Sequence, residues 1–240
     1  MTMFFISTPV AIKLVAVSAR PVCVKAVFLS LFWLALVSGC SVIDKPTRPT
    51  MYDFGPGALT TEAGMRPANE ASPSMLAPLV LADIVTTGGA LDNMSVLYRL
   101  AYTDAQQLRP YAQARWSMPP AQLVRQRLRE RLSQRRVVLK ASEGVALNRS
   151  ENASLPMLRL ELEEFSQLFS APDASVGLIR LHATLVQLTP AGERLIGQRN
   201  LVVQRPASSA DAPGGVRALT AAAEAAIEEI EQWLLQTPVR

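Results

Sequence analysis

The motif Val37-Ser38-Gly39-Cys40 has the residue types and spacing that point most directly to chemistry. It ends an uncharged apolar run, residues 26–37, which follows basic residues as in a secretory signal peptide. At roughly 1.5 Å per residue the run is about 18 Å long as a helix, too short for a hydrocarbon core of about 30 Å. Small residues directly before the cysteine make the motif a lipobox. We therefore predict that residues 1–39 are a lipoprotein signal peptide and that Cys40 takes up palmitate.

Two alternatives for this segment stay open: an ordinary signal peptide, and an N-terminal anchor helix with an incidental cysteine. Removal of residues 1–39 leaves a chain of 201 residues, which is enough for one domain with a real core. The leader carries three basic residues and no acidic ones, so 21 basic residues remain against 20 acidic ones. This near-neutral balance argues against a nucleic-acid partner, because phosphate binding needs a clustered basic surface.

Candidate catalytic and metal-ligating residues are few. His182 is the only histidine, and no cysteine or carboxylate stands near it at ligand spacing. Glu161, Glu163 and Glu164 form the densest carboxylate group, with the first two expected on one strand face and Glu164 on the other. We expect these glutamates to lie on a solvated strand edge. The sequence therefore predicts no catalytic residues, no metal, no cofactor and no enzyme activity.

Composition divides the exported chain into a tether and a domain. Residues 40–75 are rich in proline, alanine and serine, and we expect a lipidated tether with a short strand near residues 52–54 and a flexible loop after it. Plain disorder is the alternative for residues 60–75, which could bury little apolar surface. The folded domain is expected over residues 76–240.

Apolar and polar residues alternate in several segments of this domain. The pattern predicts strands over residues 79–85 and 96–102, as a hairpin or as near neighbours, and longer strands over residues 158–163, 179–185 and 195–204. One polar face on each long strand is typical of a half-buried antiparallel sheet. Residues 189–192 form a tight connection, so the last two strands should pair directly.

Two amphipathic helices are predicted to cover the sheet. Ser117 is expected to cap the first, with Pro119 and Pro120 in its first turn, and the second is expected from about residue 211 to 236. The expected core positions of the two helices are Leu123, Val124, Leu128 and Leu132 in the first, and Val216, Leu219, Ala223, Ala226, Ile227, Ile230 and Leu234 in the second, with Trp233 near the edge.

The arginines of the first helix, Arg125, Arg127, Arg129 and Arg131, fall mostly outside its apolar face. A solvated helix face is the expected role, and a basic face for anionic headgroups is the alternative. Together these elements predict an α+β fold, an α/β sandwich in which a mostly antiparallel sheet is packed by two helices.

Two segments combine aromatic and polar residues unusually densely: Tyr98-Arg99-Leu100, and the stretch from Tyr111 through Arg115-Trp116 to Pro119-Pro120. A Tyr-Asp-Phe after the lipid cysteine precedes them, and a Leu-Glu strand ending in Phe165 and an Ala-rich helix with a tryptophan follow. In this order, over residues 52–235, the elements resemble the ABC-type transport auxiliary lipoproteins, the PqiC-like family.

The resemblance implies a lipoprotein that faces the periplasm and works with an MCE-domain protein and an ABC permease and ATPase to move lipids between the two membranes. The absence of an acidic residue at Ser41 and Val42 resembles the sorting pattern of the outer membrane in Gram-negative bacteria. The alternative function is a lipid carrier that holds an acyl chain between sheet and helices. A homo-oligomer is a further expectation of the docking interpretation.

Six residues match the pattern of the family: Tyr98, Tyr111, Arg115, Trp116, Pro119 and Phe165. Four of them, Tyr98, Tyr111, Arg115 and Trp116, are the candidate partner-binding residues. Aromatic residues together with arginine are what interface hot spots use. The competing interpretation for Arg115 and Trp116 is packing, in which a buried indole with the guanidinium stacked over it fixes the turn before the helix.

Overall fold

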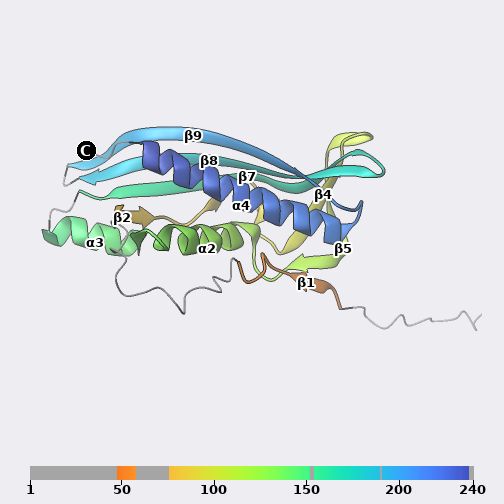
Figure 1. The fold of residues 1–240 in the computed structure, drawn as a ribbon, viewed down its shortest axis with the longest axis horizontal. Coiled ribbons are helices and arrows are strands. Elements are labelled where there is room, and N and C mark those ends of the chain that lie inside the picture. Colours follow the sequence, from red (N-terminus) through yellow and green to blue (C-terminus); the bar gives the residue numbers. More distant parts are fainter. Residues whose placement is uncertain (1–47, 58–75, 152–153, 190, 238–240) are drawn as a thin grey trace, which may run out of the picture. The chain divides into compact units, whose positions relative to one another are not determined.

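The computed structural model describes residues 48–57, 76–151, 154–189 and 191–237 (Figure 1). The lipobox, Cys40 and the expected flexible loop lie outside the described residues. The described residues all belong to one compact unit, Thr47–Arg240, in which helices pack on a twisted sheet (Figure 1).

A single sheet contains the nine strands found in the described part of the chain. They are β1 (Thr50–Tyr52), β2 (Leu76–Leu81), β3 (Val85–Thr86), β4 (Ser95–Leu100), β5 (Asp104–Trp116), β6 (Arg136–Lys140), β7 (Pro156–Ala171), β8 (Ala174–Thr189) and β9 (Gly192–Pro206). The helices that accompany them are the short 3-10 helix η1 (Gly89–Leu91) and the α-helices α2 (Pro120–Ser133), α3 (Ala141–Glu151) and α4 (Ala212–Gln236).

Strand β7 is the centre of the sheet. One of its edges pairs antiparallel with β8, which pairs antiparallel with β9. Its other edge pairs in parallel with β2, β3 and β4 in turn, along successive stretches of β7. Beyond these, β6 pairs in parallel with β2, whereas β5 pairs antiparallel with β4 and in parallel with β1.

The prediction of a mostly antiparallel sheet is therefore wrong, because the sheet is mixed and five of its eight strand pairings are parallel. Of the two arrangements expected for the first two domain strands, the hairpin is wrong, since β2 and β4 do not pair with each other; both pair with β7, at separate stretches of it. Alternation reports which side chains face the core, and it carries no information about strand direction. The α+β class itself agrees with the observed elements.

The alternation in the long strands is confirmed. In β8, for example, Ile179, Leu181, Ala183 and Leu185 are buried, and the residues between them face outward. The direct pairing of β8 with β9 across the tight connection is also confirmed, with Thr189 opposite Gly192. These inward faces, with the apolar faces of α2 and α4, form one core between sheet and helices.

Both predicted helices are present. Every expected core position in α2 and α4 is buried, and Trp233 lies at the edge of the core as predicted. Helix α4 begins as expected: Asp211 caps it by accepting a hydrogen bond from the amide of Gly214 at 2.8 Å. Bonds from the Ser209 hydroxyl and from that amide lower the pKa of Asp211.

The start of α2 differs from the prediction. Pro119, and not Ser117, occupies the capping position, with no hydrogen bond from a side chain. Pro120 then stands at the first helical position, where its missing N–H costs nothing. Helix α3 was not predicted, so the described residues contain three α-helices where two were expected.

Helix α4 approaches the sheet closely at its N-terminal end. A Cβ on Gly177 of β8 would lie 2.5 Å from the main chain of Ala218, and one on Gly215 would lie 2.0 Å from Oε1 of Gln167. Because no side chain fits in either place, glycine sets the distance between α4 and the sheet here.

Candidate functional site

Trp116 lies at the end of β5 in a buried group of three aromatic rings. Its ring centroid is 5.7 Å from that of Phe54 in an edge-to-face arrangement and 5.6 Å from that of Phe165 on β7. Trp116 is fully buried, and its Nε1 has no hydrogen-bond partner among the described residues. The packing interpretation accounts for this position, since in this structure the indole does not reach the surface.

The main chain around Trp116 joins three segments that are far apart in the sequence. The amide of Trp116 donates to the Met94 oxygen, and the amide of Ser117 donates to the Tyr52 oxygen, both at 2.7 Å. Strand β1 pairs with the last residues of β5. The segment nearest the predicted anchor is thereby fixed to the turn that starts α2.

Arg115 is half-buried beside this group. Its Nη1 donates to the main-chain oxygens of Tyr111 at 2.5 Å and Ala114 at 2.9 Å. The guanidinium thus reinforces its own strand, which is irregular here because the pairing of β5 with β4 shifts register.

Tyr98 and Tyr111 lie together, away from Trp116. Their ring centroids are 4.5 Å apart, and Tyr98 also meets Phe169 edge-to-face at 6.1 Å. The Tyr111 hydroxyl donates to Oε1 of Gln167 at 2.7 Å, and Nε2 of the buried Gln167 donates to the Ser175 hydroxyl at 2.8 Å. Both tyrosines keep part of their surface exposed.

Burial, reinforced by the nearby Tyr98 and Asp211, raises the pKa of Tyr111 above its ordinary value. The hydroxyl therefore stays protonated and keeps donating to Gln167. The structure thus brings Tyr98 and Tyr111 together as one half-exposed aromatic pair. Arg115 is joined to this pair through the Tyr111 main-chain oxygen, whereas Trp116 packs in a separate buried group.

Arg127 is a residue that the sequence analysis placed wrongly. Its side chain is only 10% exposed, and its Nη2 donates to the main-chain oxygens of Phe54 at 2.8 Å and Gly55 at 2.6 Å. Its Nε pairs with Glu224 of α4 at 3.2 Å. A signal was present, because Arg127 stands four residues after Leu123, at the spacing of the apolar face.

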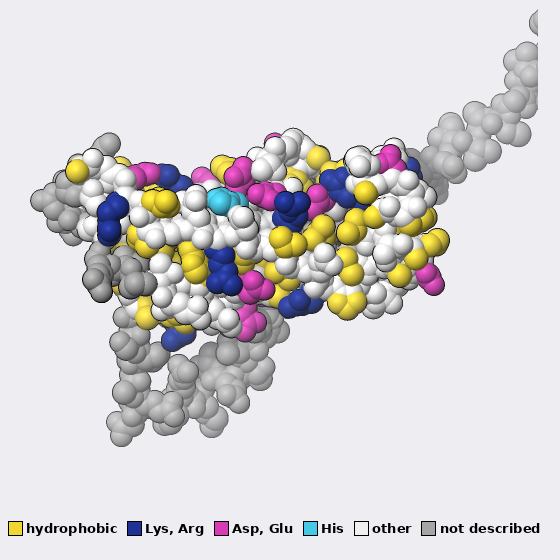
Figure 2. Space-filling view, turned by 90° about the horizontal axis from the view of Figure 1, so that it is seen from above, with side chains coloured by type: hydrophobic (Ala, Val, Ile, Leu, Met, Phe, Trp, Pro, Cys, Tyr) yellow, Lys and Arg dark blue, Asp and Glu magenta, His cyan; other side chains and the backbone are white. Residues whose placement is uncertain are grey.

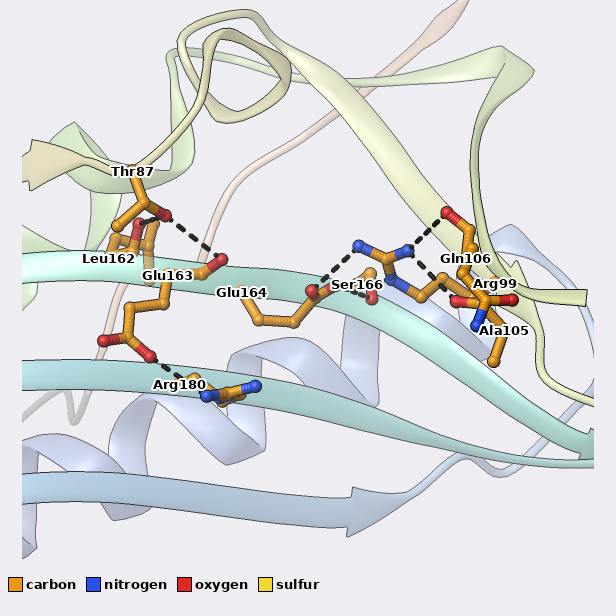
Figure 3. Close-up of polar contacts among 9 residues, drawn as sticks. All are labelled: Thr87, Arg99, Ala105, Gln106, Leu162, Glu163, Glu164, Ser166 and Arg180. Carbon is orange, nitrogen blue, oxygen red and sulfur yellow. Dashed lines mark hydrogen bonds and ion pairs between the residues drawn. The ribbon is translucent and has the colours of Figure 1, made fainter.

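The carboxylate group of β7 also differs from its prediction. A bulge between Leu162 and Glu164 puts Glu163 and Glu164 on the same outward face (Figure 3). Arg99 binds both oxygens of Glu164, at 3.0 and 3.1 Å, and Arg180 pairs with Glu163 at 3.3 Å (Figure 3). Glu163 and Glu164 thus lie on the central strand of the sheet and pair with arginines from the neighbouring strands. The expectation that they lie on a solvated strand edge is wrong.

The rest of this outward face is mixed and includes the exposed Val202 opposite Arg180. His182 is half-exposed there, and its Nδ1 lies 2.5 Å from Oδ1 of Asn200. Basic and acidic side chains are interspersed over the face, with no single sign of charge dominating (Figure 2). The ion pairs of this face join neighbouring strands and therefore have a structural role in the sheet.

The described residues contain no group of three or more histidine, cysteine, aspartate or glutamate side chains arranged to hold a metal ion. Within the same residues, no helix is both long and apolar enough to span a bilayer.

Solved structures share this fold. A Xanthomonas campestris protein of the DUF330 family superposes with a TM-score of 0.56 at 19% identity, over 70% of this chain and 90% of that protein. A second, uncharacterised protein superposes with a TM-score of 0.51 at 12% identity, over 78% of this chain and 99% of the other. No curated protein matches the chain significantly.

The sequence also matches a family model, that of the ABC-type transport auxiliary lipoprotein component, over residues 59–231. This family comprises transport lipoproteins and not enzymes, which implies a membrane-associated place in the cell envelope. The match covers well over half of the chain and confirms the resemblance drawn from the aromatic segments. The chain is a member of the ABC-type transport auxiliary lipoprotein component family.

Proposed function

We propose that this chain is anchored by lipid on Cys40 and docks from the outer membrane, in the periplasm, onto an ABC-type lipid transport system that contains an MCE-domain protein. The observation that carries the proposal is the attachment of residues 50–55 to the domain. Strand β1 pairs with β5, Phe54 packs against Trp116, and Arg127 binds the Phe54 oxygen.

This attachment limits the reach of the anchor. Ten residue steps separate Cys40 from Thr50, the first residue of β1. A fully extended chain spans at most about 3.6 Å per residue, so the lipid holds the domain within roughly 35 Å of the membrane surface. Anchoring at such a distance raises the concentration of the domain near any part of the transport system that reaches the same membrane.

Docking accounts for the interior better than acyl-chain storage does. The space between the sheet and α2 and α4 is filled by leucine, isoleucine, valine and alanine side chains, many of them fully buried. A carrier would need a cavity of several hundred cubic ångströms in that place. The partner contacts are proposed for Tyr98, Tyr111 and Arg115, with Trp116 acting through its packing on Phe54 and Phe165 at the end of β5.

The test begins with Cys40→Ser in cells that express the full chain, with Cys23→Ser as the matched control. The serine hydroxyl cannot replace the thiol that accepts the lipid, so Cys40→Ser should accumulate as an uncleaved precursor without labelled palmitate. Cys23→Ser should be processed normally. Cleavage and membrane retention of Cys40→Ser would contradict the proposed anchor.

Docking is tested separately by detergent extraction and affinity purification of the lipidated protein. Components of an ABC transporter and an MCE-domain protein should co-purify with it, and identification by mass spectrometry would name them. Recovery of the correctly anchored protein without any transporter component, after cross-linking in intact cells, would contradict docking.

A further inference from the structure

A cleft of about 700 Å³ lies beside α2, outside the candidate site described above. We call it the α2 cleft; it is defined by Asp83, Ile84, Met118, Arg125, Arg129 and Lys140. Its volume lies within the roughly 300–1,000 Å³ of small-molecule sites in proteins.

The topology of the sheet creates this cleft. Lys140 ends β6 and stands in register with Leu81, which ends the parallel strand β2. Asp83 and Ile84 follow β2 directly, and the N-terminal half of α2 closes the other side. Crevices at the carboxyl ends of parallel strands are where open sheets with packed helices usually bind ligands.

The arginines of α2 divide into two rows. One row faces α4: Arg127 pairs with Glu224 at 3.2 Å, and Arg131 pairs with Glu231 at 2.8 Å. The other row consists of Arg125 and Arg129, which lie one helical turn apart and line the cleft. Only the first row has acidic partners on α4 in the described structure.

The charge of the cleft is unbalanced. Arg125 Nη2 pairs with Asp83 at 3.0 Å, but Asp83 is 83% exposed, and the buried Nε of Arg125 has no partner among the described residues. Arg129 Nη2 donates to the Val138 oxygen at 2.8 Å, an uncharged acceptor. With Lys140, three cationic side chains line the cleft against the single carboxylate of Asp83.

The remaining lining is part apolar and part polar. Ile84, Met118 and Ala121 are its apolar residues, which we call the floor, and Gln122 and Gln126 also line the cleft. A guanidinium fork binds phosphate oxygens in pairs, and three cations around one cleft fit a group with more than one negative oxygen. An apolar floor next to such a group favours a ligand that also carries hydrocarbon, and not free phosphate.

We propose that the α2 cleft binds the phosphate head of an anionic lipid, with Arg125, Arg129 and Lys140 holding the phosphate and the apolar floor receiving the start of the acyl region. The proposal rests on the proposed function only for the class of ligand, a lipid that a transport auxiliary lipoprotein would meet. Its test is binding by the purified protein, so its failure would be distinguishable from failure to dock on a transporter.

The experiment titrates the full-length protein in maltoside micelles by calorimetry, with empty micelles as the blank. The probes are dihexanoyl phosphatidic acid, its phosphatidylcholine counterpart, and glycerol 3-phosphate. Phosphatidic acid should bind at least about tenfold more tightly than either of the others, a factor that corresponds to about 1.4 kcal/mol. Equal binding of glycerol 3-phosphate would overturn the lipid assignment.

Variants then locate the site. Arg125→Gln and Arg129→Gln should each weaken phosphatidic acid binding about tenfold, whereas Asp83→Asn should strengthen it by removing the opposing charge. Arg180→Gln, which removes an exposed arginine from the outward face, is the matched control and should leave affinity unchanged. Lys140→Gln, an exposed substitution, keeps the test valid if an arginine variant misfolds.

Two outcomes would overturn the proposal. One is unchanged affinity in Lys140→Gln and in a folded arginine variant. The other is displacement of the lipid probe by a short glutamate peptide at comparable concentration, which would identify the cleft as a surface for an acidic protein partner.

Discussion

Arg127 of α2 donates from Nη2 to the main-chain oxygen of Phe54 at 2.8 Å. The two residues are 73 positions apart, and Phe54 lies on the segment nearest the predicted anchor. The same guanidinium pairs with Glu224 of α4 at 3.2 Å. One side chain therefore ties the entering segment to both helices that cover the core.

Replacing Arg127 should destabilise the domain far more than an exposed arginine would. Arg127→Ala leaves the buried Phe54 oxygen without a donor, and hydrogen bonds to charged groups are worth about 1.5–3 kcal/mol, so we expect a loss of about 2 kcal/mol. Urea denaturation of the full chain in micelles, followed by tryptophan fluorescence, measures the change.

The control is Arg159→Ala, which removes an exposed pair with Glu193 worth less than about 1 kcal/mol. Equal losses in the two variants would mean that the contact between Arg127 and Phe54 contributes nothing to stability.

Arg127 also shows where reasoning from the sequence succeeded and where it did not. The apolar faces of α2 and α4 were predictable because their spacing follows the helical period over several turns. The same spacing placed Arg127 on the apolar face, but the oxygen that it binds comes from a segment 73 positions away and could not be identified from the sequence. Long-range partners of this kind carry no local signal.

The sheet, too, was predictable in part. The inward residues of β7 and β8 followed from alternation, but the bulge near Glu163 reversed the expected face of Glu164, because one extra residue shifts the alternation. Strand β5 contains Pro110, which favours a turn in a sequence; it is tolerated here because β1 covers only the last residues of β5. Strands β6 and β7 both run parallel to β2 and are joined through α3, a helix that was not predicted, so their direction could not be read from the sequence.

A charge placed in the core should unfold the domain at low urea. Leu128 of α2 and Ile230 of α4 are both completely buried in the same core. Leu128→Asp or Ile230→Asp should cost at least about 3 kcal/mol, since an unpaired buried charge adds to the lost packing. Gln126→Asp, an exposed change on α2, is the control, and a similar loss there would contradict the assignment of helix faces.

Alkaline pH should weaken the domain through Tyr111. Its pKa is raised in the folded protein by burial first, so the folded state keeps a proton that the unfolded state releases above pH of about 10. This contribution is fully present below that pH and is lost as the pH rises. In Tyr111→Phe the group cannot ionise, although the bond to Gln167 is also lost.

The free energy of unfolding should therefore differ between wild type and Tyr111→Phe at pH 8, and the difference should narrow at pH 11. Chemical denaturation at both pH values measures it. A difference that stays constant, or that widens with pH, would show that Tyr111 ionises as readily in the folded protein as in the unfolded one.

Trp116 should act on partner binding through the fold and not through direct contact. Trp116→Ala removes a fully buried ring that packs on Phe54 and Phe165, and such truncations cost about 3–5 kcal/mol. Trp116→Phe keeps an aromatic ring and removes an Nε1–H that has no partner among the described residues, so it should cost much less.

Melting temperature and co-purification of transporter components, measured together, decide whether Trp116 supports the fold or contacts the partner directly. We expect both to fall in Trp116→Ala and both to be largely retained in Trp116→Phe; a Trp116→Phe protein that melts normally but loses its partners would assign Trp116 to the interface itself.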